Sequence, residues 1–202
     1  MKTPMQYQMS EFDCGPTTVL NALRFLFECE EMLPETLKYI MLYCLDTYNE
    51  KGECGKRGTS KEALVFLSSW LNLFAQMKAF PLVSEFLGDE EVVISPDSRI
   101  IDAVIKGGVV VLRVLCEGGH YVLLTGVSGD KLELFDPYYR TQKIESEGVE
   151  MFDDSGKGPN RSVTLDAINS EDSFYRMGGF QKREALIIYN TRTQKPQSDS
   201  EK

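Results

Sequence analysis

The chain has 202 residues, with 22 Lys or Arg against 31 Asp or Glu, so its formal net charge at pH 7 is −9. This length fits one domain with a sizeable core, and 42 % hydrophobic with 26 % charged residues is typical of a globular protein rather than a disordered one. An acidic chain does not suit binding to a nucleic-acid duplex, because such binding needs cationic side chains to displace counterions. We therefore expect no nucleic-acid partner.

The five cysteines indicate free thiols in a reduced protein. They are odd in number and form no Cys-x-x-Cys pair, so we expect no zinc site, and we expect no cofactor. We expect Cys29, Cys44 and Cys116 to be buried as small hydrophobic side chains and Cys54 to lie in a loop. The first residues hold no apolar run of signal-peptide length, and no uncharged stretch of about 18 residues occurs. These features predict a cytoplasmic protein with no membrane partner.

Apolar residues at helical spacing predict four helices in the first half of the chain. Pro16 suits the first turn of the first helix, because the N–H that proline lacks would stay unpaired there. Cys14 is therefore expected at or just before the N-terminus of that helix. Thr59 or Ser60 is expected to cap the third helix. The predicted helices span residues 16–27, 34 to about 48, 61 to about 77 and 99–106, with a glycine-rich loop at 51–58.

Beyond the fourth helix the pattern changes to short runs of β-branched and apolar residues. These predict strands at 109–115, 120–127, 131–135 and 185–189, joined by short turns. Helices first and antiparallel strands second indicate the α+β class, with an N-terminal helical part packed on a C-terminal antiparallel sheet. We expect a single domain over residues 1–190 and a disordered polar tail over 191–202.

His120 is the only histidine and stands at the start of a predicted strand. If residues 128–130 form the turn of the following hairpin, His120 pairs with Tyr138 and Asp136 is its diagonal neighbour on the same face. A carboxylate at that position can reach an imidazole nitrogen. A two-residue turn without a bulge would instead put the two side chains on opposite faces. A lone histidine on a strand needs no functional role, so this interpretation depends on the register.

Cys14 is the candidate nucleophile. The positive end of a helix dipole favours a thiolate, and a nearby imidazolium favours it further. The Asp13 carboxylate would oppose this effect if it pointed the same way, whereas Gly15 leaves room for a substrate backbone and has an N–H that can donate to an oxyanion. The alternative for any free cysteine is a small buried side chain. Gln8 lies in a segment that could bring its amide beside Cys14, although Gln6 is equally available.

Four short motifs occur in order along the chain: Gln8, Asp13-Cys14-Gly15-Pro16, Gly119-His120-Tyr121 and Asp136-Pro137. Together they resemble the cysteine peptidases that cleave double-glycine leaders from bacteriocin precursors, within the papain-like superfamily. They look most like the stand-alone relatives of that peptidase family. The motifs cover residues 5–140 approximately, while the helical stretch 37–77 and the segment after Asp136 are not explained by them.

The resemblance implies a papain-like fold and a cysteine peptidase or amidase that acts on a peptide or protein substrate. It implies Cys14 as nucleophile, His120 as base and later acid, and Asp136 as the group that orients the ring. It implies Gln8 as the oxyanion donor. The reaction would proceed by thiolate attack, an acyl-enzyme and hydrolysis.

Two alternatives remain open at this stage. The same residues could transfer the acyl group to an amine or a thiol instead of water, since both reactions begin with the same acyl-enzyme. A papain-like module could also bind or regulate a peptide partner without catalysis. The presence of Cys14, His120 and Asp136 together favours an enzyme, because a binding module needs none of the three.

Overall fold

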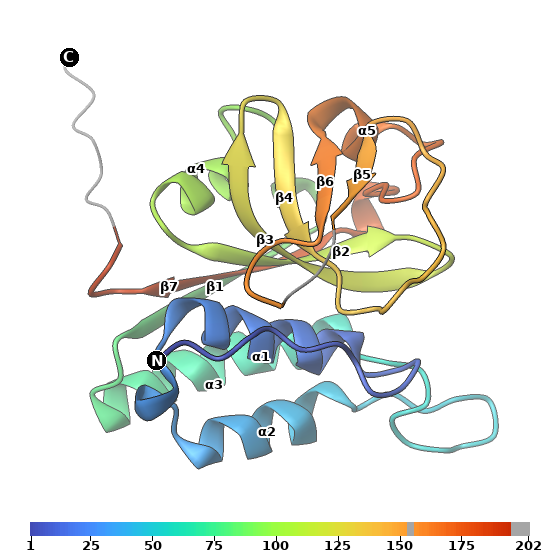
Figure 1. Cartoon of the computed structure of the whole chain (residues 1–202). Helices are drawn as coiled ribbons and strands as arrows, with labels where there is room; N and C mark the ends of the chain where they lie inside the picture. The colour runs from blue at the N-terminus through green and yellow to red at the C-terminus, as the bar shows by residue number, and fades with distance from the viewer. Residues whose placement is uncertain (153–155, 195–202) are drawn as a thin grey trace.

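A computed structural model describes residues 1–152 and 156–194 of the chain (Figure 1). Its helices and strands in chain order are α1 (Cys14–Leu26), η1 (Cys29–Glu31), α2 (Pro34–Cys44), α3 (Lys61–Lys78), β1 (Leu82–Gly88), η2 (Asp89–Glu91), α4 (Arg99–Ile105), β2 (Val109–Leu115), β3 (Gly119–Ser128), β4 (Lys131–Phe135), β5 (Val149–Met151), β6 (Arg161–Thr164), α5 (Leu165–Asn169), η3 (Phe180–Lys182) and β7 (Glu184–Asn190). Within this described part, seven strands form one antiparallel sheet in the order β1-β7-β2-β3-β4-β6-β5. The predicted α+β class is confirmed.

The sheet is buried on both faces. Helices α1 and α3 lie against one face, with α2 packed on the side of them away from the sheet, while α4 and α5 lie on the opposite side of the sheet (Figure 1). Along β2, Val109 and Val111 belong to the core under the three helices, whereas Val110, Leu112 and Val114 belong to the core on the other face. Burial on both faces explains why β2 reads as a continuous apolar run instead of an alternating one.

Helices α1 and α3 follow their predicted ranges closely. The α1 helix begins at Cys14, so the thiol belongs to the first helical residue. The α3 helix begins at Lys61, because the hydroxyl of Ser60 accepts a hydrogen bond of 3.0 Å from the N–H of Ala63. This bond satisfies one of the donors that a helix start leaves unpaired.

Helix α2 ends at Cys44, earlier than the predicted end near residue 48. The residues after it contact the loop before α3 instead of continuing the helix. The Asp46 carboxylate accepts hydrogen bonds from both the N–H and the hydroxyl of Ser60, at 3.0 and 2.5 Å. The Thr47 hydroxyl donates to the carbonyl of Gly58 at 2.7 Å. Short polar side chains near a helix end compete for backbone groups in this way.

Strands β1, β5 and β6 and helix α5 were not predicted. Strand β1 pairs with the C-terminal β7 although it lies between two helices in the sequence, so helices and strands are not fully segregated along the chain. Strands β5 and β6 have three and four residues at the far edge of the sheet. Segments this short carry too few side chains for a periodic pattern to stand out.

In the hairpin of β3 and β4, the residues near His120 pair as predicted, but the turn that joins the strands differs from the predicted one. Its turn has two residues, since Ser128 pairs with Lys131, so the predicted three-residue turn is wrong. A bulge between Leu124 and Gly126 then shifts the register by one residue, and Leu123 pairs with Phe135. A bulge adds one residue to one strand, so every side chain beyond it changes face. His120 and Asp136 therefore end on the same face.

The five cysteines are free thiols. Cys44 and Cys116 are buried, as predicted, whereas Cys29 is exposed in η1 rather than buried. Cys54 lies between α2 and α3, in the predicted loop, and is exposed. Burial raises the pKa of the Cys44 thiol to about 12.

The predicted polar tail lies mostly outside the described residues. Of its described part, Thr191 donates its N–H to the carbonyl of Pro81 at 2.9 Å, and Arg192 forms an ion pair with Glu31. A domain boundary at residue 190 stays a prediction. In residues 1–152 and 156–194, no helix combines the length and the apolar character that spanning a bilayer requires.

Candidate active site

The hydroxyl of Thr18 links the first turn of α1 to β3 next to His120. The hydroxyl of Thr18 lies 2.7 Å from the carbonyl oxygen of Cys14 and 3.0 Å from that of Tyr121. Because Tyr121 follows His120 directly, this hydroxyl sets the position of the helix start relative to the imidazole. Cys14 itself is 7 % exposed.

The Asp13 carboxylate is bonded by the loop before α1 and by Thr17. It accepts hydrogen bonds from the hydroxyl of Ser10 at 2.5 Å, from the N–H groups of Met9 and Ser10 at 3.0 and 2.7 Å and from the hydroxyl of Thr17 at 3.2 Å. Burial alone would raise the pKa of Asp13, but these hydrogen bonds outweigh it and hold the pKa below its usual value. The carboxylate thus organises the loop before α1.

The space that a Cβ of Gly15 would occupy is already filled by Thr59, so it is not open to a substrate. A Cβ built at this position would lie 2.1 Å from Oγ1 of Thr59, which itself donates to the carbonyl of Cys44 at 2.6 Å. The glycine lets the start of α1 approach the loop before α3. The expectation that Gly15 leaves room there for a substrate backbone is therefore wrong.

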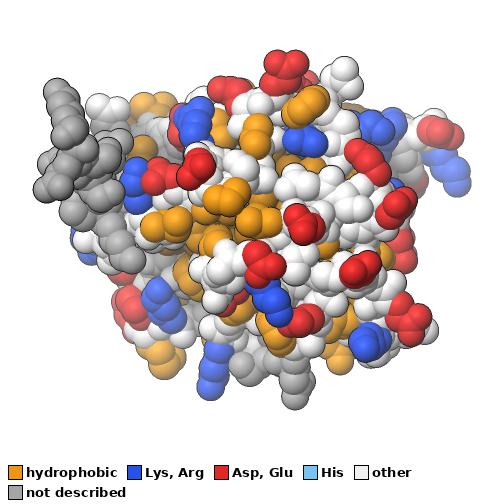
Figure 2. All heavy atoms as spheres, turned by 90° about the horizontal axis from the view of Figure 1, so that it is seen from above, with side chains coloured by type: hydrophobic (Ala, Val, Ile, Leu, Met, Phe, Trp, Pro, Cys, Tyr) orange, Lys and Arg blue, Asp and Glu red, His pale blue; other side chains and the backbone are white. Residues whose placement is uncertain are grey.

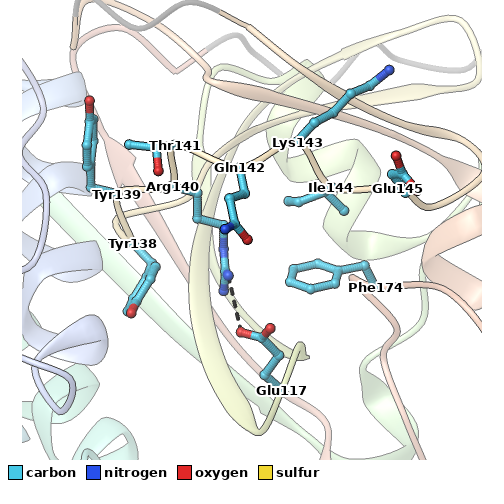
Figure 3. A pocket seen from close by; sticks show the side chains of 10 residues that line it. All are labelled: Glu117, Tyr138, Tyr139, Arg140, Thr141, Gln142, Lys143, Ile144, Glu145 and Phe174. Atoms are coloured by element: carbon cyan, nitrogen blue, oxygen red, sulfur yellow. Dashed lines mark hydrogen bonds and ion pairs between the residues drawn. The ribbon is translucent and has the colours of Figure 1, made fainter.

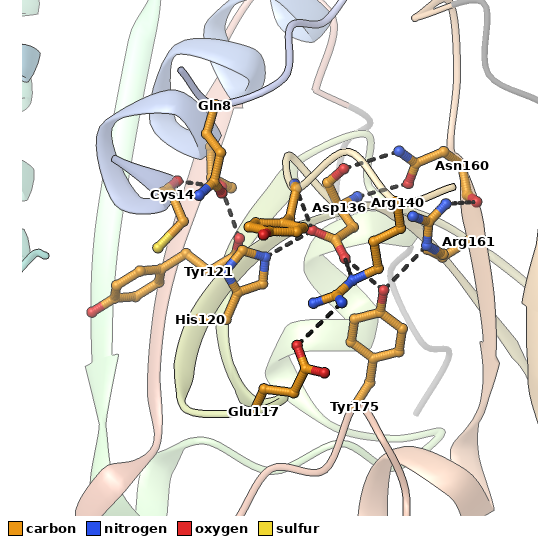
Figure 4. Close-up of polar contacts among 12 residues, drawn as sticks. Gln8, Cys14, Glu117, His120, Tyr121, Asp136, Arg140, Asn160, Arg161 and Tyr175 are labelled. Atoms are coloured by element: carbon orange, nitrogen blue, oxygen red, sulfur yellow. Dashed lines mark hydrogen bonds and ion pairs between the residues drawn. The ribbon is translucent and has the colours of Figure 1, made fainter. Parts of the chain in front are cut away.

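His120 and Asp136 meet where β3 begins and β4 has just ended. Nε2 of His120 lies 2.7 Å from Oδ1 of Asp136, and both side chains are buried (Figure 4). Because a histidine ring has two nitrogens, this bond leaves Nδ1 for other partners. The Cys14 side chain interacts with the same ring. The structure thus places three of the four predicted site residues, Cys14, His120 and Asp136, next to one another (Figure 4).

The electrostatics favour a charged histidine. Burial disfavours the imidazolium, but the hydrogen bond to Asp136 and the interaction with Cys14 outweigh it and raise the pKa of His120 to about 9. For Asp136, burial would raise the pKa, but the bonds from His120, Tyr175 and Tyr138 hold it below its ordinary value. The surroundings of the pair therefore favour an imidazolium bonded to a carboxylate.

Further hydrogen bonds position both the side chain and the backbone of Asp136. The hydroxyl of Tyr175 donates to Oδ2 at 2.6 Å, and the N–H of Tyr138 donates to Oδ1 at 2.8 Å. The Asn160 side chain bonds both backbone groups of Asp136, accepting from its N–H at 2.7 Å and donating to its carbonyl at 2.9 Å. Nε of Arg161 donates to the Tyr175 hydroxyl at 3.1 Å. Hydrogen bonds to both oxygens therefore fix the orientation of the carboxyl group.

No sequence pattern indicated that Asn160, Arg161 and Tyr175 belong to the site. They lie in the region after Asp136 that no motif covers, and each reaches the site only through the pairing of β6 with β4 and the packing of the segment before η3. A buried Arg161 without a neighbouring acidic residue in sequence carries no local signal of its partner.

Gln8 lies beside Cys14, with its side chain extending towards the helix start (Figure 4). Its N–H donates to the carbonyl of Pro137 at 2.8 Å, which ties this segment to the residue after Asp136. Its Nε2 donates to the carbonyl of Ser10 at 2.7 Å, and within the described residues Oε1 has no hydrogen-bond partner. An amide nitrogen has two hydrogens, so one remains for a further acceptor. Gln6 is exposed, and its backbone N–H and carbonyl bond the Asn21 side chain at 2.8 Å each.

Over the described ranges, no group of three or more His, Cys, Asp or Glu side chains could hold a metal ion. No protein-family model and no curated protein matches the sequence. Among solved structures, the chain is similar to one described as the crystal structure of a double glycine motif protease from an AMS/PCAT transporter in complex with the leader peptide. The alignment covers 93 % of this chain and 91 % of that chain, with 15 % identity and a TM-score of 0.40. At this identity and TM-score, the similarity by itself assigns no function to the chain.

Proposed function

We propose that this protein is a papain-like cysteine peptidase or amidase in which Cys14, His120 and Asp136 form the catalytic triad. One observation carries the proposal: His120 is bonded through Nε2 to Asp136 at 2.7 Å and interacts with the Cys14 side chain at the start of a helix. A nucleophile, a base and a group that orients the base are the three roles that covalent acyl transfer needs.

In the proposed reaction the Cys14 thiolate attacks the carbonyl carbon of the scissile bond. The His120 imidazolium gives its proton to the departing amine, so the C–N bond breaks and a thioester remains on the sulfur. Water then attacks the thioester while His120 takes a proton from it, and the acid product leaves as the C–S bond breaks. Asp136 stays ionised throughout and holds the ring in place.

Gln8 is proposed to donate the free hydrogen of its amide to the oxyanion. Its neighbour Pro137, which follows Asp136, accepts the backbone N–H of Gln8, so the donor and the triad carboxylate are connected through one peptide segment. Donors that are already in position before the reaction lower the barrier, because no reorganisation is needed when charge develops.

The test compares thiol reactivity with exposure. Full-length protein is treated with limiting iodoacetamide, and the alkylation rate of each cysteine is followed by peptide mass mapping. We expect Cys14 to react faster than Cys54 and Cys29, although it is buried and they are exposed. His120→Ala should remove that advantage while leaving the rate at Cys54 unchanged. Equal or slower labelling of Cys14 in the wild-type protein would contradict the proposed nucleophile.

A second measurement distinguishes the reaction types. Incubation with a mixture of unmodified peptides should yield cleaved peptides and a thioester adduct at Cys14, and Cys14→Ser should yield neither. Products joined to an added amine would instead identify acyl transfer. A folded protein that retains peptides without forming an adduct would identify a binding module.

A further inference from the structure

A pocket of about 320 Å³ is lined by Tyr138, Arg140 and Phe174, among other residues (Figure 3), and Arg140 also lies near Asp136 (Figure 4). Arg140 is its central charged group. The carbon of the guanidinium lies 4.6 Å from the ring centre of Tyr138 and 4.9 Å from that of Phe174, so the group is held between two aromatic rings. Such cation–π contacts position a guanidinium while leaving its edge free for an acceptor.

The guanidinium is also linked to the proposed triad. Its Nε lies 4.0 Å from Oδ2 of Asp136, whose other oxygen bonds His120. The Tyr138 ring lies edge-on to the His120 ring with 6.4 Å between their centres. The Arg140 side chain is 16 % exposed. Arg140 is thus a pre-positioned cation that shares one carboxyl group with His120.

The present partner of Arg140 is an exposed side chain. Oε2 of Glu117 lies 3.1 Å from Nη1 of Arg140, and the Glu117 side chain is 68 % exposed. Glu117 lies between β2 and β3 and precedes Gly118 and Gly119, so little packing holds it. Ion pairs with one exposed partner contribute little to stability, and exchanging such a partner for another carboxylate costs little.

We propose that Arg140 binds a carboxylate of the peptide substrate, which replaces Glu117. The inference rests on the proposed function and names its substrate class: peptides with an acidic side chain or a C-terminal carboxylate near the scissile bond. Guanidinium and carboxylate match in shape and charge, which makes arginine suited to this recognition.

The net charge of −9 does not oppose this binding at close range. Charges farther apart than about 8 Å are largely screened at physiological ionic strength, whereas Arg140 acts at contact distance. Lys143 lines the same pocket and adds a second positive charge, which balances Glu117 and Glu145 there.

Binding is tested on full-length protein labelled with ¹⁵N, by following the Nε–H signal of Arg140. The probes are N-acetylglutamic acid α-amide, with a side-chain carboxylate, and N-acetylglycine, with a terminal one. N-acetylglutamine α-amide and N-acetylglycinamide are their neutral counterparts. We expect saturable shifts with one or both carboxylates and none with the neutral probes. The responding carboxylate identifies its source.

Variants then assign the site. Arg140→Gln should abolish the binding, measured at the His120 ring signal, and Arg140→Lys should weaken it, because lysine lacks the planar pair of donors. Glu117→Gln removes the internal competitor and should tighten carboxylate binding about two- to fivefold. Lys143→Gln is the matched control and should change the affinity less than about twofold, because Lys143 is not held against Asp136. Glu117→Gln alters an exposed position, so it remains informative if the Arg140 variants fail to fold.

Three results would overturn the proposal: no shift with any carboxylate, equal binding of the neutral probes, or preferential binding of N-acetyl-lysine amide that Glu117→Gln weakens. None of these measurements requires peptide cleavage. Carboxylate binding in a protein with an unreactive Cys14 would refute the proposed function alone. Peptide cleavage without carboxylate binding would refute the subsite alone.

Discussion

Replacing Tyr175 with Phe removes one hydroxyl from the groups that hold Asp136. That hydroxyl donates to Oδ2 of Asp136 at 2.6 Å and accepts from Nε of Arg161 at 3.1 Å. Phenylalanine keeps the ring and its edge-on contact with Phe174, whose centre lies 5.0 Å away. A hydrogen bond to a charged group contributes about 1.5–3 kcal/mol, and the variant leaves a buried donor without its partner. We expect the free energy of unfolding to fall by about 2–4 kcal/mol.

The same variant should change the titration of His120. Tyr175 draws negative charge towards Oδ2, away from the oxygen that bonds the imidazole. Without that hydroxyl the carboxylate becomes a stronger partner for the imidazolium, so the pKa of His120 should rise further. Because the chain has one histidine, its imidazole signal can be followed by NMR without ambiguity.

The assay pairs urea unfolding with this titration, and Tyr139→Phe is the control. Tyr139 is 64 % exposed, so losing its hydroxyl should change stability by less than about 0.5 kcal/mol and leave the titration unchanged. If Tyr175→Phe behaved like the control in both measurements, the account of how Asp136 is held would be refuted.

Three further predictions follow from the site. Gly15→Ala should destabilise the fold by about 1–3 kcal/mol in urea, because its Cβ would overlap Oγ1 of Thr59; an unchanged unfolding midpoint would contradict this packing. Since the folded pKa of His120 is raised to about 9 from 6.5, its stabilisation should be complete below about pH 6.5 and decline as pH rises through about 9. Urea midpoints should show that decline in the wild-type protein and not in His120→Gln. Gln8→Ala should lower single-turnover cleavage by about 10²–10³-fold with the fold intact, and full activity would exclude Gln8 as the oxyanion donor.

Much of the local structure follows from nearest neighbours in the sequence. The stripe of apolar residues in α1, the cap at Ser60 and the β-branched run of β2 each contain the information that defines the element, so their ranges were predicted closely. Cys14 at a helix start and His120 at a strand start were therefore placed correctly without a structure. The short edge strands were missed because their stability comes from pairing with a neighbour and not from their own side chains.

The sequence alone did not decide whether the side chains of His120 and Asp136 would meet. The face on which each side chain lies depends on one residue of register, and the two-residue turn alone would have separated them. The bulge between Leu124 and Gly126 restores the alignment. A glycine within a strand is typical of a bulge, but Gly126 alone does not determine how the pairing shifts. Likewise, Tyr175 meets Asp136 only because two distant segments pack together. The sequence by itself determined which residues could react, whereas the tertiary structure decided which of them meet, because meeting depends on contacts between parts of the chain that share no local pattern.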